Sequence, residues 1–207
     1  MSEDSKKRIL ENLNKITSRE EQIASSPGCN FLKTYHIPLV QLFEEKLSAV
    51  NGIFIYCKSK SDFHEFMHSF LNESGLSSIF CIESPVIELL QNTVPVSDDL
   101  TAKTEVAITG CEFLVAQTGS AILSTAQTHS RRSFVYPPVH IIVAGKSQLV
   151  DHLENGLNQI ALKYKNNLPS QITTITGPSR TADIEKTLVL GAHGPNKLII
   201  VYLEVEI

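Results

Sequence analysis

The sequence contains no CxxC pair. Its four cysteines, Cys29, Cys57, Cys81 and Cys111, lie far apart in a chain of 207 residues. Zinc ribbons and iron–sulfur clusters draw on closely spaced cysteine ligands, so neither can be built locally here. Sparse cysteines in a chain of this length are typical of a reducing compartment. We therefore expect no metal centre, and nothing in the sequence indicates a bound cofactor.

Strong charge of one sign is also absent, as are long apolar runs. The 18 basic and 22 acidic residues give a net charge of −4, and no basic block is present, which argues against nucleic acid as a partner. No apolar run approaches the roughly 18 residues of a membrane span. The opening residues lack the apolar stretch of a signal peptide. We expect a soluble, cytoplasmic protein.

The spacing of apolar residues in the first part of the chain predicts two helices. Residues 3–24 carry a narrow apolar stripe on a charged helix, and a second helix follows Pro38. The narrow stripe fits either packing on another subunit, which would make a homo-oligomer, or loose contact with the domain. We assign residues 1–50 to an N-terminal helical extension and residues 51–207 to the main domain.

The main domain alternates between strands and helices. Residues 52–57 and 78–82 are short apolar strands, with helices over 61–72 and after Pro85, a pattern that predicts a parallel sheet. Short strands within 104–144 indicate an antiparallel excursion beside that sheet. Further along, the spacing predicts a helix over 147–164. Strands are expected over 139–143, 172–176, 188–190 and 198–205.

The segment TGPSRTADIE, residues 176–185, is the most informative for chemistry. We expect a strand to stop at Gly177 and Pro178, and Ser179, Arg180 and Thr181 to precede a short helix. Turn amides, hydroxyls and a guanidinium at such a place would bind a carboxylate or phosphate, beyond the carboxyl end of a strand. The alternative is structural: Thr181 caps the helix, Asp183 complements its dipole and Arg180 forms an ion pair.

Two glycine-containing turns could complete such a site. His193 and Gly194 precede the last strand, where the imidazole could serve as acid, base or donor. Thr118, Gly119 and Ser120 form a strand–turn–strand junction that a ligand could approach closely. Each also fits an ordinary turn. Arg131 and Arg132 could close over an anion or simply be solvated.

One pattern resembles a zinc site. His64-Glu-Phe-Met-His68 matches H-E-x-x-H, the zinc-binding helix of metalloproteases. We interpret this segment instead as a crossover helix, because its apolar stripe runs beside both histidines and no third ligand is indicated.

Taken together, four segments resemble the lactate utilization protein C family, whose members are stand-alone LUD domains. The segments are QTGSAILS, YPPVHIIVAGKSQLV, TGPSRTADIE and GAHGP, in this order, and the resemblance covers roughly residues 50–207. It implies a three-layer α/β/α open sheet of the ribose-phosphate-isomerase and coenzyme-A-transferase type. It also implies a role in oxidising L-lactate to pyruvate, alongside partner subunits that carry iron–sulfur clusters.

The resemblance implies a shared cleft, without a known catalytic assignment. The motif positions are Thr118, Gly119, Pro137, Pro138, His140, Gly177 to Asp183, and His193 to Pro195. This chain has Gln117 where the family usually has a glutamate before the TG turn. An amide can only hydrogen-bond, so an acid–base or covalent role at that position is in doubt.

Three functions follow as hypotheses. The leading one is an accessory subunit in lactate or related organic-acid oxidation, binding a small anion through Ser179, Arg180 and Thr181, with His193 and the 118–120 turn completing the cleft. The second is a stand-alone isomerase or group-transfer enzyme acting on a phosphorylated or coenzyme-A substrate. The third is an interaction protein whose motifs only shape turns.

Overall fold

The computed structural model describes residues 35–207 apart from 92, 128–130, 182–188 and 191–193. The predicted helix over 3–24, and with it the homo-oligomer contact, lies outside the described residues. The compact unit begins at Tyr35, so the helix after Pro38 belongs to the same unit as the sheets. No helix among the described residues is both long and apolar enough to cross a membrane.

The helices largely follow the predicted pattern. Ser59 accepts a hydrogen bond from the Asp62 amide at the start of α3, and Gly75 ends that helix in the left-handed conformation. Helix α5 begins only at Leu153, so the predicted start at 147 was wrong. Leu149 and Val150 instead pair with Leu114 and Val115, because strand pairing outweighs a helical spacing. The α-helices are α2 (Leu39–Ala49), α3 (Lys60–Ser74), α4 (Ser84–Leu90) and α5 (Leu153–Tyr164), with 3₁₀ turns η1 (Arg131–Phe134) and η2 (Lys146–Gln148).

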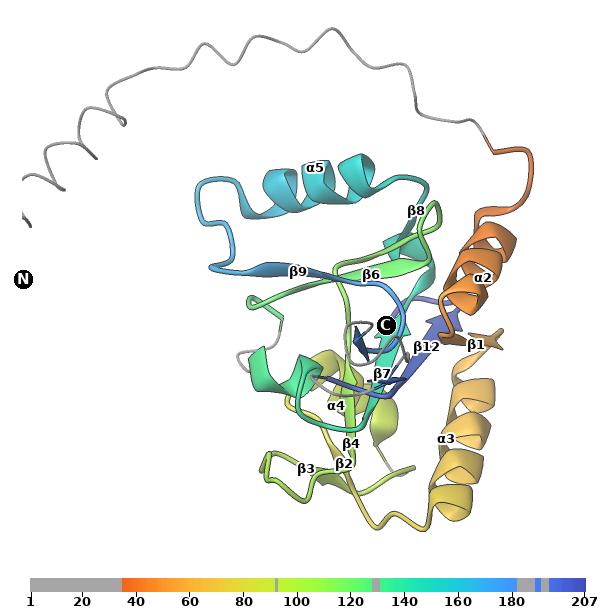
Figure 1. Ribbon diagram of the computed structural model, residues 1–207, viewed down its shortest axis with the longest axis vertical. Helices are drawn as coiled ribbons and strands as arrows, with labels where there is room; N and C mark the ends of the chain where they lie inside the picture. Colours follow the sequence, from red (N-terminus) through yellow and green to blue (C-terminus); the bar gives the residue numbers. More distant parts are fainter. Residues whose placement is uncertain (1–34, 92, 128–130, 182–188, 191–193) are drawn as a thin grey trace, which may run out of the picture. The chain divides into compact units, whose positions relative to one another are not determined.

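Six strands form a wholly parallel sheet, in the order β1-β12-β7-β4-β2-β3. The predicted α/β class is confirmed, because α3 and α4 pack on one face of this sheet and α2 on the other (Figure 1). The strands are β1 (Ile53–Cys57), β2 (Ile79–Phe80), β3 (Val96–Ser97), β4 (Val106–Thr109), β7 (Val139–Ala144) and β12 (Lys197–Leu203).

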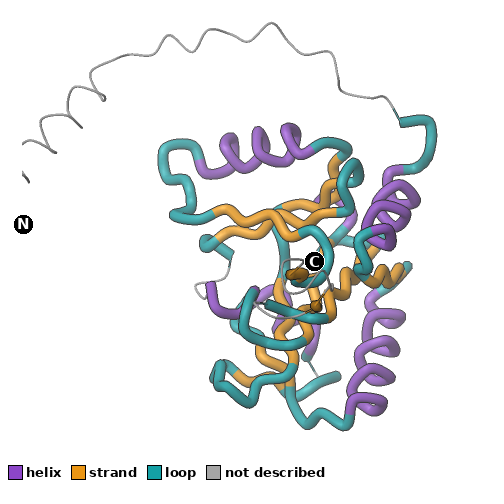
Figure 2. The backbone as a smooth tube through the Cα atoms, viewed as in Figure 1, coloured by secondary structure: helices purple, strands orange, loops and turns teal. Residues whose placement is uncertain are grey.

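A second sheet of four strands, in the order β8-β5-β6-β9, shares the face on which α2 packs. Its antiparallel pairs β5–β6 and β6–β9 confirm the predicted excursion. Helix α5 covers its far side through Ile160, so strands lie at the centre with helices outside (Figure 2). The strands are β5 (Phe113–Val115), β6 (Ser120–Ser124), β8 (Leu149–Val150) and β9 (Ile172–Ile175).

The short helix expected after Thr181 falls on residues that the structure does not describe, and a strand precedes it. Arg180–Thr181 forms β10 and pairs antiparallel with β11 (Val189–Leu190). Residues 182–188, including Asp183, lie outside the described residues, and with them the expected helix start.

Two glycine turns hold the end of α2. Gly119 and Gly177 have φ of 63° and 73°, which favours glycine over residues with a side chain. A Cβ at Gly119 would lie 2.3 Å from the Leu47 amide nitrogen, and one at Gly177 would lie 2.4 Å from the Val50 carbonyl oxygen. Both loops thus approach the α2 backbone so closely that only glycine fits.

This close approach predicts a strong effect of Gly119→Ala. The substitution should lower the free energy of unfolding by at least about 3 kcal/mol, through the left-handed backbone and the collision with α2. Gly75→Ala is the matched control: its φ is 65° but nothing lies within 4 Å of its Cβ. It should cost only about 1 kcal/mol. Urea unfolding measures both, and equal losses would show that contact with α2 contributes nothing.

Candidate functional site

The structure brings two of the predicted segments together. The Ser120 hydroxyl hydrogen-bonds to the hydroxyls of Thr118, at 2.8 Å, and Thr176, at 2.7 Å. These bonds join the β5–β6 turn to the loop that follows β9. Thr118 and Thr176 are exposed, while Gly119 and Ser120 are buried. The pair of loops therefore presents two threonines to solvent on a rigid base.

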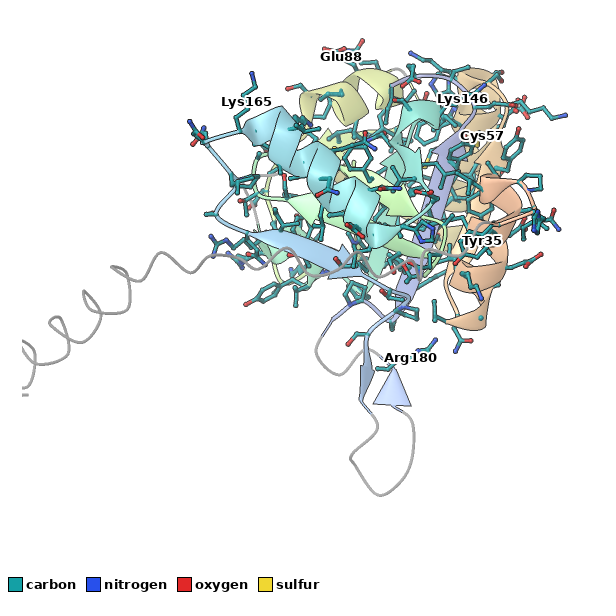
Figure 3. The ribbon with its side chains drawn as sticks, turned by 90° about the horizontal axis from the view of Figure 1, so that it is seen from above. Tyr35, Cys57, Glu88, Lys146, Lys165 and Arg180 are labelled. Carbon is teal, nitrogen blue, oxygen red and sulfur yellow. The ribbon has the colours of Figure 1, made fainter. Side chains whose placement is uncertain are left out.

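Arg180 stands where that second loop meets α2. Its guanidinium donates to the Val50 carbonyl oxygen, at the carboxyl-terminal cap of α2. A cation at this end of a helix complements the helix dipole. The side chain is exposed, and it lies at the base of the β10–β11 hairpin (Figure 3). A guanidinium has five N–H donors, so one bond to Val50 leaves others for a ligand.

The other predicted segment reaches the same place. The Ser179 amide donates to the Pro195 carbonyl at 2.8 Å, and the Asn196 amide donates to the Pro138 carbonyl at 2.9 Å. A Cβ at Gly194 would lie 3.0 Å from that of Ser179. The stretches near 180 and 194 therefore meet, as the sequence suggested. His193 and the Thr181 side chain lie outside the described part of the chain.

Two sheets meet at this surface. The loop that begins at Thr176 follows the carboxyl end of β9, as predicted, but β9 belongs to the second sheet, whose pairing with β6 is antiparallel. Pro138 immediately precedes β7, and Asn196 precedes β12. The same loops therefore gather at the amino ends of these two strands of the parallel sheet.

His140 lies apart from the exposed loops. Its ring is fully buried, 2.8 Å from the Thr109 hydroxyl and stacked 6.1 Å from Phe134. Burial lowers the pKa of His140 to about 3, so the ring is neutral at physiological pH. A role for His140 in contacting a ligand stays a prediction.

Sequence reasoning missed two buried glutamates. Glu112 is 3% exposed and accepts hydrogen bonds from Ser124 at 2.5 Å, Tyr164 at 2.7 Å and Lys163 at 2.8 Å. These bonds tie the second sheet to α5. No motif marks Glu112, because its partners come from two other elements. With its carboxylate bonded to three donors, Glu112 has a structural role.

Glu83 is the chemically more unusual of the two. It precedes α4, yet its side chain makes no cap and instead accepts the Gly110 amide at 3.0 Å through Oε2. Its Oε1 is buried, with no hydrogen-bond partner among the described residues. Burial, aided by the charge of Glu112, raises the pKa of Glu83 from 4.5 to about 7. Cys111, beside both glutamates, is fully buried and its pKa is raised, so it is no nucleophile.

The two H-E-x-x-H histidines lie on α3, as predicted. The His64 Nε2 atom is 2.9 Å from the Leu89 carbonyl oxygen, and His68 is exposed. No group of three or more histidine, cysteine or acidic residues within the described ranges could hold a metal ion.

Comparison with known proteins places the chain in a family. The sequence model of the LUD domain matches residues 96–203, just over half of the chain. The chain is a member of the LUD-domain family. The family resemblance inferred from the four sequence segments is thereby confirmed.

Several curated relatives match part of the sequence of this LUD protein. An uncharacterized protein of Neisseria meningitidis is 33% identical over 96 residues, covering 46% of this chain and 41% of its own length. Proteins named lactate utilization protein C are 29% identical in Deinococcus radiodurans, covering 56% and 54%, and 36% identical in Bacillus subtilis, covering 44% and 39%. The matches thus span about half or less of each relative.

A solved structure shares the fold. The crystal structure of a DUF162 family protein from Deinococcus radiodurans aligns with a TM-score of 0.58 at 18% identity. The alignment covers 80% of this chain and 96% of that one. At this identity the likeness concerns the fold alone.

The raised pKa of Glu83 predicts a pH dependence of stability. The folded state holds the proton more tightly than the unfolded state, so this contribution is complete below pH 4.5 and is lost as the pH rises through 7. Between pH 5 and 8 the loss lowers the free energy of unfolding by on the order of 2 kcal/mol. Glu83→Gln should remove this part of the profile in urea unfolding, whereas Glu88→Gln, an exposed site on the same helix, should leave it. Identical profiles for all three proteins would contradict the assignment.

Proposed function

We propose that this LUD protein serves the oxidation of L-lactate, or a related organic acid, as a cytoplasmic accessory subunit that binds a small anion. The observation that carries the proposal is the contact of Ser179 with Gly194 directly beside the exposed Arg180. Membership of the LUD family and the name of the lactate utilization relatives support the substrate class. A carboxylate suits this edge, because a guanidinium and a hydroxyl are its preferred donors.

We call the surface formed by Ser179, Arg180 and Gly194 the anion-binding edge. In this proposal the edge holds the ligand and does not transform it. Arg180 supplies the charge, and its bond to Val50 fixes the guanidinium before the ligand arrives. Ser179 adds a half-buried hydroxyl. Among the described residues of this edge there is no acid or base to move a proton: Gln117 is an amide, and His140 is buried and neutral. The redox step then falls to partner subunits that carry iron–sulfur clusters.

Binding of sodium L-lactate, pyruvate and phosphate, at constant ionic strength, tests the ligand part by calorimetry. Arg180→Ala should weaken the binding of the preferred anion at least tenfold, because a charge-assisted bond contributes about 1.5–3 kcal/mol. Arg180→Lys should restore part of it, since the charge remains without the planar fork. Lys146→Ala is the control, because Lys146 is an exposed cation on the 3₁₀ turn η2 and is not one of the candidate ligand-binding residues. If none of these anions binds the wild type, the edge is structural.

Reconstitution tests the partner part. The chain should co-purify with iron–sulfur proteins encoded beside it, and these should oxidise L-lactate with an artificial electron acceptor only when the chain is present. Oxidation at the same rate without the chain would contradict an accessory role. Turnover of a phosphorylated or coenzyme-A substrate by the chain alone would favour the enzyme alternative.

A further inference from the structure

A small pocket lies beside the carboxyl ends of the parallel strands, whereas the anion-binding edge lies at the amino ends of β7 and β12. Its volume is about 290 Å³, and it lies between the start of α3 and helix α4. Helix α3 follows β1, α4 follows β2, and the chain after β12 completes the lining. Carboxyl ends of parallel strands are where open α/β sheets bind ligands. The lining residues are Lys60, His64, Pro85, Glu88, Leu89 and Ile207.

The first histidine of the H-E-x-x-H pattern lines this pocket in a fixed orientation. The Nε2 atom of His64 is 2.9 Å from the Leu89 carbonyl oxygen. Because a carbonyl oxygen can only accept, Nε2 carries a proton, and the neutral ring offers Nδ1 as an acceptor. Nδ1 has no hydrogen-bond partner in the described part of the chain. The pocket therefore contains a preoriented, half-buried ring with one nitrogen available to a ligand.

Two opposite charges line the same pocket from different helices. Lys60 lies one turn before His64 on α3, and Glu88 lies on α4. Both side chains are exposed, and within the described ranges neither forms an ion pair. A simple anion or cation would meet attraction from one of them and repulsion from the other. A ligand that carries both charges can pair with each.

The rest of the pocket selects for size and for an apolar part. Pro85, Leu89 and Ile207 supply carbon surface, against which an aliphatic group is favourably buried. The volume lies just below the range of about 300–1,000 Å³ that drug-sized ligands occupy. The ligand is therefore a small molecule with an aliphatic part, and a nucleotide is too large.

We propose that this pocket binds a neutral aliphatic α-amino acid as its zwitterion. The ligand carboxylate pairs with the Lys60 ammonium, and the ligand ammonium donates to the Glu88 carboxylate and to His64 Nδ1. The aliphatic side chain lies against Leu89 and Ile207. The site is independent of the anion-binding edge and of the function proposed above.

L-Leucine is the probe, with two analogues that each lack one charge. 4-Methylpentanoate has no ammonium group, and 3-methylbutylamine has no carboxylate. Calorimetry at neutral pH and constant ionic strength should show saturable binding of L-leucine to the wild type. Either analogue should bind at least tenfold more weakly, because each loses one charge-assisted contact. In nitrogen NMR the Nδ1 resonance of His64 should shift on addition of L-leucine.

Two variants test the charged residues separately. Lys60→Gln and Glu88→Gln should each weaken the binding of L-leucine at least tenfold. Lys58→Gln and Glu65→Gln are the matched controls, because both residues are exposed, lie beside or on α3 and do not line the pocket. Both control variants should bind L-leucine as the wild type does.

Three results would overturn the proposal. Absence of saturable L-leucine binding to the wild type would show that the pocket does not take an amino acid. If 4-methylpentanoate bound as tightly as L-leucine, the ammonium would not be recognised and the carboxylate would belong at the anion-binding edge. Undiminished binding in both Lys60→Gln and Glu88→Gln would place the amino acid elsewhere on the molecule. Lactate carries no ammonium group, so none of these results decides the anion experiments.

Discussion

The carboxyl-terminal turn of α2 is the point on which the anion-binding edge depends. Gly119 and Gly177 bring two loops against the α2 backbone, and the Arg180 guanidinium bonds to the Val50 carbonyl at the same turn. Backbone contacts this close tolerate no side chain, so they fix the loops more firmly than flexible side chains could. Helix α2 lies before residue 96, where the LUD match begins. The geometry of the family motifs is thus set partly by a helix outside the matched region.

The two ends of the parallel sheet differ in electrostatic character. The amino ends of β7 and β12 meet exposed loops that carry Arg180, and this end suits an anion. The carboxyl ends of β2 and β4 meet the buried Glu83, with Glu112 near it.

Much of the fold could be predicted from local patterns. The apolar spacing places α2, α3 and the central strands nearly where they lie, because each buries a regular face. The spacing failed at Leu149 and Val150, where pairing with β5 decides the conformation. Such partners lie far along the chain. A helical period or a cap motif cannot reveal them.

The segments of the candidate site could be predicted from the sequence, but their position on the sheets could not. The segments near 180 and 194 do meet, but which end of the sheet they occupy depended on the sheet to which β9 belongs. Glu83 was missed because a glutamate before Ser84 and Pro85 is typical of an ordinary helix start. Only its burial and its bond to Gly110, 27 residues away, set it apart.

Hydrogen–deuterium exchange with and without sodium L-lactate tests the central claim most directly. The account predicts slower exchange in peptides that contain residues 176–180 and 194–196, where Ser179, the neighbour of Arg180, contacts Gly194. Peptides at the carboxyl ends of β2 and β4 should exchange unchanged. Protection confined to those carboxyl ends, or no protection at saturating lactate, would contradict an anion-binding role for the Arg180 edge.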